Sequence, residues 1–379
     1  MSLFQMDRLC SKVLVGIASI SILISCGKRP SASSPYKAEV IKPGASDYSL
    51  ETVEFKYLTN VDSMDGSILK IIGHAALNAS AGIDELINPA DHNKLYLDKG
   101  RDVVLDYWTD GGVIKARNFD SMAMLTLYYN YEVVIDYWTS QLGLDLNNFG
   151  KLRMYYNPRV KASSEAGSIE QTIKVNAAFL PGPRDFLIFK TSALEQLPIN
   201  MNQGVLAHEF GHAIFDYKFA GMDASVYTSS ASAEEQLSGI NEGIADFFSY
   251  AVTNRRTEYE KSLSSLGSER NLPVSWTLST LNSSTCSGSF YCKGSILASA
   301  LYEISQISGN SSLTTAKTLY ESLDDFRSDW DSLKNGTSFE YYFLIKKFVA
   351  NLDTSKKASA CQVFTKWFDT TTFKEKMGC

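Results

Sequence analysis

Residues 201–215 read Met-Asn-Gln-Gly-Val-Leu-Ala-His-Glu-Phe-Gly-His-Ala-Ile-Phe and contain the pattern H-E-x-x-H. The apolar spacing predicts a helix over 202–219. Positions four apart lie on one helical face, so the imidazoles of His208 and His212 can converge on one ion. Glu209 projects beside them, where it can take a proton from a water molecule. Gly211 costs about 1 kcal/mol of helix propensity, and we expect it where the backbone passes close to an active cleft.

A third ligand is needed, because tetrahedral catalytic zinc uses three protein ligands and keeps one open position. No histidine follows His212, so a carboxylate is expected. Residues 239–248, Gly-Ile-Asn-Glu-Gly-Ile-Ala-Asp-Phe-Phe, belong to a second predicted helix over 234–253. On it, Glu242 and Asp246 share a face, which suits Glu242 as ligand and Asp246 as acceptor of a ligand's second ring N–H. Asn241 is expected beside them.

Two alternatives to this site stay open at this point. Glu234 and Glu235 are competing carboxylates, although their polar surroundings contain no apolar residue to hold them. The two histidines could also have ordinary core or surface roles, in which case the motif is accidental. His74 and His92, the remaining histidines of the chain, are not expected to have a function.

The strings HEFGH and NEGIAD together resemble those of the thermolysin-like zinc metallopeptidases, the gluzincins. In that family, motifs of this form carry two histidine ligands, the general-base glutamate, a glutamate ligand and an aspartate behind a histidine. The matching residues are His208, His212, Glu209, Glu242 and Asp246. The resemblance, which covers about residues 118–310, implies an endopeptidase with one Zn²⁺ per chain and a peptide or protein substrate. It also implies an α+β, zincin-like fold of two lobes, β-rich and then helical, with the zinc site in the cleft between them.

Weaker resemblances suggest further site residues. Tyr291 aligns with the family's transition-state histidine, and its hydroxyl could donate to a developing oxyanion. Asn176, Ala177 and Phe179, followed by a predicted strand at 185–189, are similar to the family's substrate-binding edge strand, where peptides pair through main-chain hydrogen bonds. Arg270 could bind a substrate carbonyl, although a surface arginine is the commoner case.

This sequence also departs from the family pattern. A tyrosine that the family places before the glutamate ligand is Ala233 here, so Tyr227 or Tyr291 would have to substitute. Gly204 and Thr253 stand where relatives often have calcium carboxylates, and calcium is therefore not expected. The departures favour an alternative function, a membrane-anchored protein that keeps the zincin fold as a binding or structural module with little turnover. The intact Glu209 argues against it.

The N-terminus resembles that of a bacterial lipoprotein. Arg8 and Lys12 precede an apolar stretch at 13–24, which is too short to span a bilayer comfortably and ends in Leu-Ile-Ser-Cys at 23–26. The resemblance to a lipobox implies lipidation of Cys26 and attachment to a membrane. An ordinary signal peptide or an uncleaved anchor stays the alternative. The residue after Cys26 is Gly27 and not aspartate, which resembles lipoproteins that are sorted to an outer membrane. We therefore expect a lipid anchor in the bacterial cell envelope, at the outer membrane and facing the periplasm or the surface.

The composition of the whole chain gives further information. The chain has 379 residues, and 44% of them are apolar. This amount of apolar sequence excludes intrinsic disorder. With 36 basic and 42 acidic residues the net charge is −6, which argues against a nucleic-acid partner. We expect a monomer with a signal peptide (1–25), a flexible tether (26–47), a β-rich lobe with a long helix from Asp120 (48–200) and a helical lobe carrying most of the zinc site (201–379).

The cysteines agree with an exported protein. Without Cys10 and Cys26, four thiols remain, and they allow three pairings. We favour two short loops, Cys286–Cys292 and Cys361–Cys379, in an oxidising compartment. A cysteine zinc site is the weaker alternative, because no C-x-x-C spacing occurs.

Overall fold

The computed structural model describes residues 35–44, 47–79, 96–164, 167–171, 177–181, 184–190, 196–220, 231–257, 259–263, 269–282, 286, 290–333 and 341–377. They all belong to one compact unit, Ala32–Cys379. The predicted signal peptide and Cys26 lie outside these ranges, as do His92, Asn176, Tyr227 and Cys379. Within the described ranges, no helix has the length and apolar character needed to cross a membrane.

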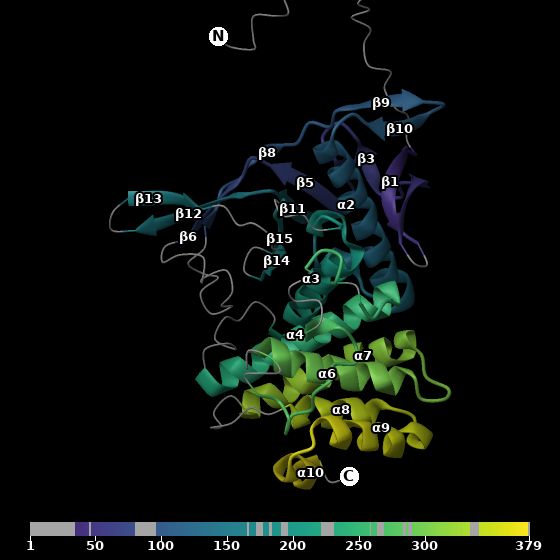
Figure 1. Cartoon of the computed structure of the whole chain (residues 1–379), viewed down its shortest axis with the longest axis vertical. Coiled ribbons are helices and arrows are strands. Elements are labelled where there is room, and N and C mark those ends of the chain that lie inside the picture. Colours follow the sequence, from purple (N-terminus) through teal and green to yellow (C-terminus); the bar gives the residue numbers. More distant parts are fainter. Residues whose placement is uncertain are drawn as a thin grey trace, which may run out of the picture. The chain divides into compact units, whose positions relative to one another are not determined.

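Strands fill the N-terminal part of the chain and helices the C-terminal part (Figure 1). One sheet has the order β2 (Tyr48–Glu54), β1 (Lys37–Pro43), β10 (Val113–Ala116), β9 (Tyr107–Asp110). The largest has the order β14 (Ala177–Leu180), β15 (Asp185–Ile188), β11 (Leu152–Tyr156), β5 (Leu69–Gly73), β4 (Asp65–Gly66), β3 (Leu58–Asn60), with β8 (Arg101–Asp102) also on β5. The third has the order β13 (Gly167–Gln171), β12 (Arg159–Ser164), β6 (Ala76–Ala79), β7 (Tyr96–Leu97).

The prediction of a flexible tether over 26–47 is wrong for Lys37–Pro43, which forms β1. This strand pairs antiparallel with β2 and parallel with β10. Ala38 and Val40 alternate along it and are fully buried, so a short apolar alternation is enough to draw the segment into the core. Strands β9 and β10 are joined by a tight turn, with Gly111 and Gly112 at φ +56° and +83°.

The long helix predicted from Asp120 is α2 (Phe119–Asp136), continued by a π-helical turn at Tyr137–Gln141. Its N-cap is Asn118, because the Asn118 Oδ1 accepts from the Ser121 amide at 2.8 Å. The helix packs against both β1 and α3 and thereby joins the sheets to the helical part.

The remaining helices include the two predicted over 202–219 and 234–253. They are α3 (Gln203–Phe215), continued by a π-helical turn at Asp216–Ala220, and α4 (Ala231–Thr253), α6 (Phe290–Ser305), α7 (Ser312–Leu333), α8 (Tyr342–Asn351), α9 (Thr354–Trp367) and α10 (Thr371–Met377). Short 3₁₀ turns lie at Leu146–Asn148 and Ile199–Met201. The predicted order of strands and then helices is confirmed, whereas two lobes with a cleft stay a prediction.

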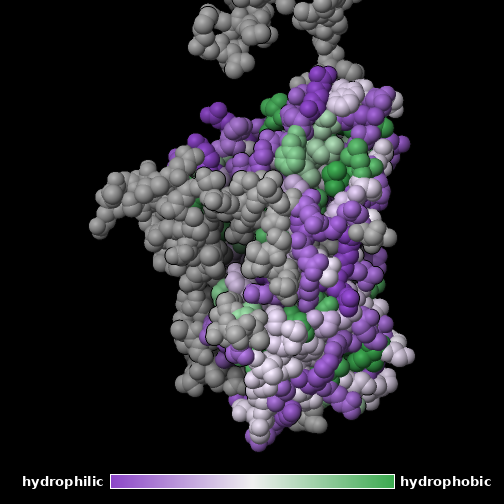
Figure 2. All heavy atoms as spheres, viewed as in Figure 1, coloured by the Kyte–Doolittle hydropathy of each residue, from purple (hydrophilic) through white to green (hydrophobic). Residues whose placement is uncertain are grey.

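Two further features bear on the surface and the covalent frame. The predicted Cys286–Cys292 disulfide is present, and Cys361 is also disulfide-bonded. Hydrophilic residues predominate on the described part of the face in Figure 2. Among described residues the exposed large apolar side chains are Leu50, Val104, Trp108 and Phe119. Isolated apolar side chains of this kind are normal on a folded protein.

Candidate metal centre

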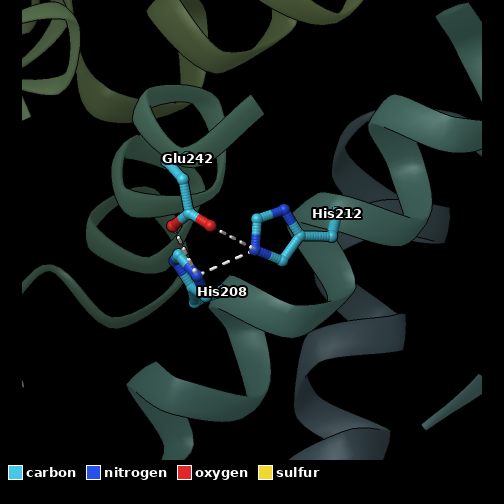
Figure 3. Close-up of side chains that lie close together, drawn as sticks. All are labelled: His208, His212 and Glu242. Carbon is cyan, nitrogen blue, oxygen red and sulfur yellow. Dashed lines mark hydrogen bonds and ion pairs between the residues drawn. The ribbon is translucent and has the colours of Figure 1, made fainter. Parts of the chain in front are cut away.

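Helix α3 begins where the sequence supplies a cap. Asn202 is extended, and its Oδ1 accepts from the Gly204 amide at 2.9 Å. From there the helix runs through the core, and nearly all of its residues are buried. His208 and His212 leave α3 on one face, toward Glu242 of α4 (Figure 3). The spacing of four residues therefore places both imidazoles on one helical face, as the sequence predicts.

Three potential ligand atoms converge between the two helices. The Nε2 atoms of His208 and His212 are 3.0 Å apart. Glu242 places Oε2 3.4 Å from the first and Oε1 3.6 Å from the second. All three ligand atoms lie within 4.8 Å of one another. The competing Glu235 instead forms an ion pair with Lys293.

The other nitrogen of each ring lies close to an oxygen of α4. His208 Nδ1 lies 2.9 Å from Asp246 Oδ1, and His212 Nδ1 lies 2.9 Å from Asn241 Oδ1. A carboxylate and an amide oxygen are acceptors, so each Nδ1 carries the hydrogen and each Nε2 of a neutral ring presents its lone pair. Asp246 and Asn241 thus lie where the sequence predicts, behind the rings.

The donor set fits a divalent cation. Two imidazole lone pairs and a carboxylate face one another and would repel without a positive charge between them. Tetrahedral bonds of about 2.0–2.1 Å imply ligand-to-ligand distances of about 3.3 Å, and the three distances are 3.0, 3.4 and 3.6 Å. Burial disfavours a charged His208, but Asp246 and Glu242 outweigh it and raise its pKa to about 9. The site therefore attracts positive charge strongly.

Glu209 lies between the two histidines in the sequence, and its side chain is buried. It is not one of the three residues whose ligand atoms converge. Burial raises the pKa of its carboxyl, while the neighbouring His208 and His212 oppose that rise. A carboxylate with a raised pKa is a better proton acceptor near neutral pH than an exposed one. Glu209 thus has the electrostatic character that its predicted role requires.

Arg270 is a site residue that the sequence argument undervalued, because it is buried and not on the surface. One guanidinium nitrogen donates to Glu242 Oε2 at 2.7 Å and to Asp246 Oδ1 at 2.8 Å. Its Nε donates to Asp246 Oδ2 at 3.1 Å, and the Tyr259 hydroxyl donates to Asp246 Oδ1 at 3.0 Å. Burial opposes ionisation of Glu242 and Asp246, but His212 and Arg270 help to lower the pKa of the first and Arg270 that of the second. The sequence offers no signal for this contact, since Arg270 lies on a separate segment.

Tyr291, the second residue of α6, lies beside the same cluster. The Arg270 guanidinium carbon is 5.1 Å from the centre of its ring and 5.3 Å from that of Tyr259. Burial, with the charge of Glu242, raises the pKa of the Tyr291 hydroxyl. The hydroxyl is therefore a protonated donor at neutral pH, next to the ligand cluster.

Glycines let the ligand-bearing helices approach closely. A Cβ at Gly211 would lie 2.7 Å from the Cα of Ala245, so this glycine faces α4 and not an active cleft, which corrects our expectation. On the other side of α4, a Cβ at Gly243 would lie 2.5 Å from the Gly294 carbonyl oxygen. Glu242 thus sits on a helix wedged between two close neighbours, and backbone contacts determine how far it stands from α3.

The predicted substrate strand is only partly described. Ala177 and Phe179 belong to β14, which ends the sheet and pairs on one side with β15. The Phe179 side chain is buried against Phe186, with ring centres 5.2 Å apart, so only main-chain groups of this residue suit an extended peptide. β14 contacts α3, the helix that carries both histidines.

No protein-family model matches this chain, and no curated protein sequence matches it. Among solved structures, the chain is similar to the precursor of protealysin, a metalloproteinase from Serratia proteamaculans. The TM-score is 0.45 and the identity 12%, and the alignment covers 79% of this chain and 87% of that chain. At this level the likeness carries no argument about activity, so a functional conclusion has to rest on the side chains of the metal centre.

Proposed function

We propose that this protein is a zinc-dependent metallopeptidase that cleaves peptide bonds within a chain. The observation that carries the proposal is the convergence of His208, His212 and Glu242, with the Asp246 carboxylate 2.9 Å from His208 Nδ1 and the Asn241 oxygen hydrogen-bonded to His212 Nδ1. Two histidines, a carboxylate ligand and a buried non-ligand glutamate are the set that metal-assisted hydrolysis needs.

Each residue has a role that follows from its surroundings. Zinc held by His208, His212 and Glu242 would polarise the scissile carbonyl and lower the pKa of a water molecule. Glu209 accepts the proton of the attacking water and passes it to the leaving amine, a transfer that its raised pKa favours. The Tyr291 hydroxyl, protonated at neutral pH, can donate to the developing oxyanion.

The substrate is proposed to be an extended peptide lying along β14. In the order of the described strands β14 ends its sheet, and peptides often bind by adding a strand at such an end through main-chain hydrogen bonds, whatever their side chains are. Because β14 contacts α3, a peptide bound there would run past the metal centre. Lipidation of Cys26 and attachment to the bacterial cell envelope are further parts of the proposal, and they rest on residues 8–27 of the sequence.

The decisive experiment measures metal content and cleavage in one preparation. We expect one zinc per chain, hydrolysis of casein or a peptide library, loss of hydrolysis with o-phenanthroline and recovery with added zinc. Glu209→Gln should retain the zinc and lose the hydrolysis. Glu235→Gln, which changes a glutamate paired with Lys293, is the matched control and should behave as wild type.

Other outcomes separate the alternatives. Stoichiometric zinc without any hydrolysis by the wild-type protein would favour the binding or structural module. Absence of zinc, together with unchanged stability of His208→Ala, would favour an accidental motif. Wild-type hydrolysis by Glu209→Gln would refute its role as the base.

A further inference from the structure

A cavity lies away from the metal centre, where β1, α2, α3 and α4 meet. It has a volume of about 400 Å³ and is lined by Lys42, Pro43, Gly44, Tyr129, Val133, Gln203, Thr253, Asn254 and Arg255. Thr253 is eleven residues beyond Glu242 on α4, which corresponds to about 16 Å along the helix. The cavity is therefore separate from the predicted zinc ligands, and its volume suits a small molecule.

The lining has a consistent chemical character. Lys42 and Arg255 are cationic, and no carboxylate is among the described residues that line the cavity. Tyr129, Gln203 and Asn254 add hydroxyl and amide groups, which can donate hydrogen bonds, whereas the Thr253 hydroxyl already donates to the Ser249 carbonyl.

Both cations make other contacts, and the contact of Lys42 is one that a ligand can replace. Lys42 forms an ion pair with Glu51 at 3.2 Å in which both side chains are exposed, and such pairs contribute little to stability. Hydrogen bonding to Glu51 raises the pKa of Lys42, so the lysine stays charged at neutral pH. Arg255 donates to the Gly44 carbonyl, lies 5.4 Å from the centre of the Tyr48 ring and keeps its positive charge at neutral pH.

We propose that this cavity binds a small molecule bearing a compact oxyanion, a carboxylate or a phosphate, between Lys42 and Arg255. The planar guanidinium matches two oxygens of either group, and the ammonium adds a second positive charge. Hydroxyl and amide groups of the lining hold the rest of the ligand. Binding would join β1 to the ends of α3 and α4 and thus stabilise the fold. This proposal does not depend on hydrolysis at the metal centre.

Thermal unfolding and calorimetric titration of the full chain test the proposal with two probes. Inorganic phosphate represents phosphate ligands and citrate represents carboxylate ligands, each compared with sodium chloride at equal ionic strength. We expect at least one probe, at about ten times its Kd, to raise Tm by about 2 °C. The probe that binds more tightly identifies which oxyanion the cavity prefers.

Variants separate this cavity from non-specific effects of salt. Arg255→Gln and Lys42→Gln should each weaken binding about tenfold or more. Arg256→Gln is the matched control, since its neighbouring guanidinium lies over Tyr302 and does not line the cavity. Arg255→Lys keeps the positive charge but loses the planar guanidinium that matches two oxygens. This variant should therefore bind the probe with intermediate affinity, even if Arg255→Gln folds poorly. Tm shifts no larger than those with chloride, or equal responses of the Arg255, Lys42 and control variants, would overturn the proposal.

Discussion

Replacing Gly211 by alanine tests how closely α3 and α4 must approach to build the metal centre. The new Cβ would lie 2.7 Å from the Cα of Ala245, 3.2 Å from its Cβ and 3.5 Å from its carbonyl oxygen. Ordinary contacts begin at 3.4 Å, so the closest one is 0.7 Å too short. The atom in the way is backbone, and it cannot rotate aside. Helix α4 must therefore shift by about 0.7 Å or tilt away from α3.

The shift acts on zinc affinity more than on stability. Ala245 lies one helical turn after Glu242, so a displaced α4 moves the carboxylate away from His208 and His212, from which it stands at 3.4 and 3.6 Å. Metal sites tolerate ligand displacements of about 0.2 Å. We expect zinc affinity to fall about 10- to 100-fold. Alanine gains about 1 kcal/mol of helix propensity, which offsets part of an overpacking cost of about 1–3 kcal/mol.

Competition with a chromophoric chelator measures zinc affinity, and thermal unfolding of the metal-free protein measures stability. Serine at position 211 should weaken zinc binding at least as much as alanine. Ala207→Gly, also in α3, is the control, because it costs about 1 kcal/mol of helix propensity without adding volume. It should bind zinc with nearly wild-type affinity. If Gly211→Ala binds zinc as tightly as the wild type, helix approach does not determine the position of Glu242, and our reasoning is wrong.

Three further predictions concern the charges around the centre and one buried acid. Asp246→Asn should lower zinc affinity about 10- to 100-fold in the same competition assay, because a neutral amide supports the His208 ring less well; unchanged affinity would contradict this role. Tyr291→Phe keeps the ring beside Arg270, so kcat should fall about tenfold or more with zinc affinity unchanged, and an unchanged kcat would remove the hydroxyl from the mechanism. Burial raises the pKa of Asp216 to about 7, although Arg184 opposes the rise. Because the folded protein binds this proton more tightly than the unfolded chain, stability should fall by up to about 1.4 kcal/mol per pH unit between roughly pH 4 and 7 and level off above pH 7. Chemical denaturation at several pH values should therefore show that Asp216→Asn improves stability relative to wild type most at pH 7–8 and least near pH 4, and a difference independent of pH would exclude this titration.

Local helical geometry explains which parts of the site the sequence predicted. His208 and His212 share a face because they are four residues apart, and the same holds for Glu242 and Asp246. These relations need no knowledge of the rest of the fold. The Cys286–Cys292 disulfide is also local, since it spans only six residues.

Contacts between distant segments explain what the sequence did not reveal. Burial of Arg270 depends on a separate segment folding back onto α4, and no periodicity marks it. The burial of β1 depends on pairing with β10, more than seventy residues later, so its composition alone resembled a linker. Gly211 is recognisable as a helix-weakening residue, but Ala245 as its neighbour is not.

The sequence by itself determined that His208 and His212 share one helical face and that Glu242 and Asp246 share another, because each pair is four residues apart and a helix has 3.6 residues per turn. Only the tertiary structure decided that the two turns face each other across a glycine contact, and that Arg270, from a separate segment, pairs with both carboxylates of the second turn. The physical reason is range: hydrogen bonds within a helix relate residues a few positions apart, whereas the distance between helices depends on packing of side chains and backbone that are far apart in the sequence.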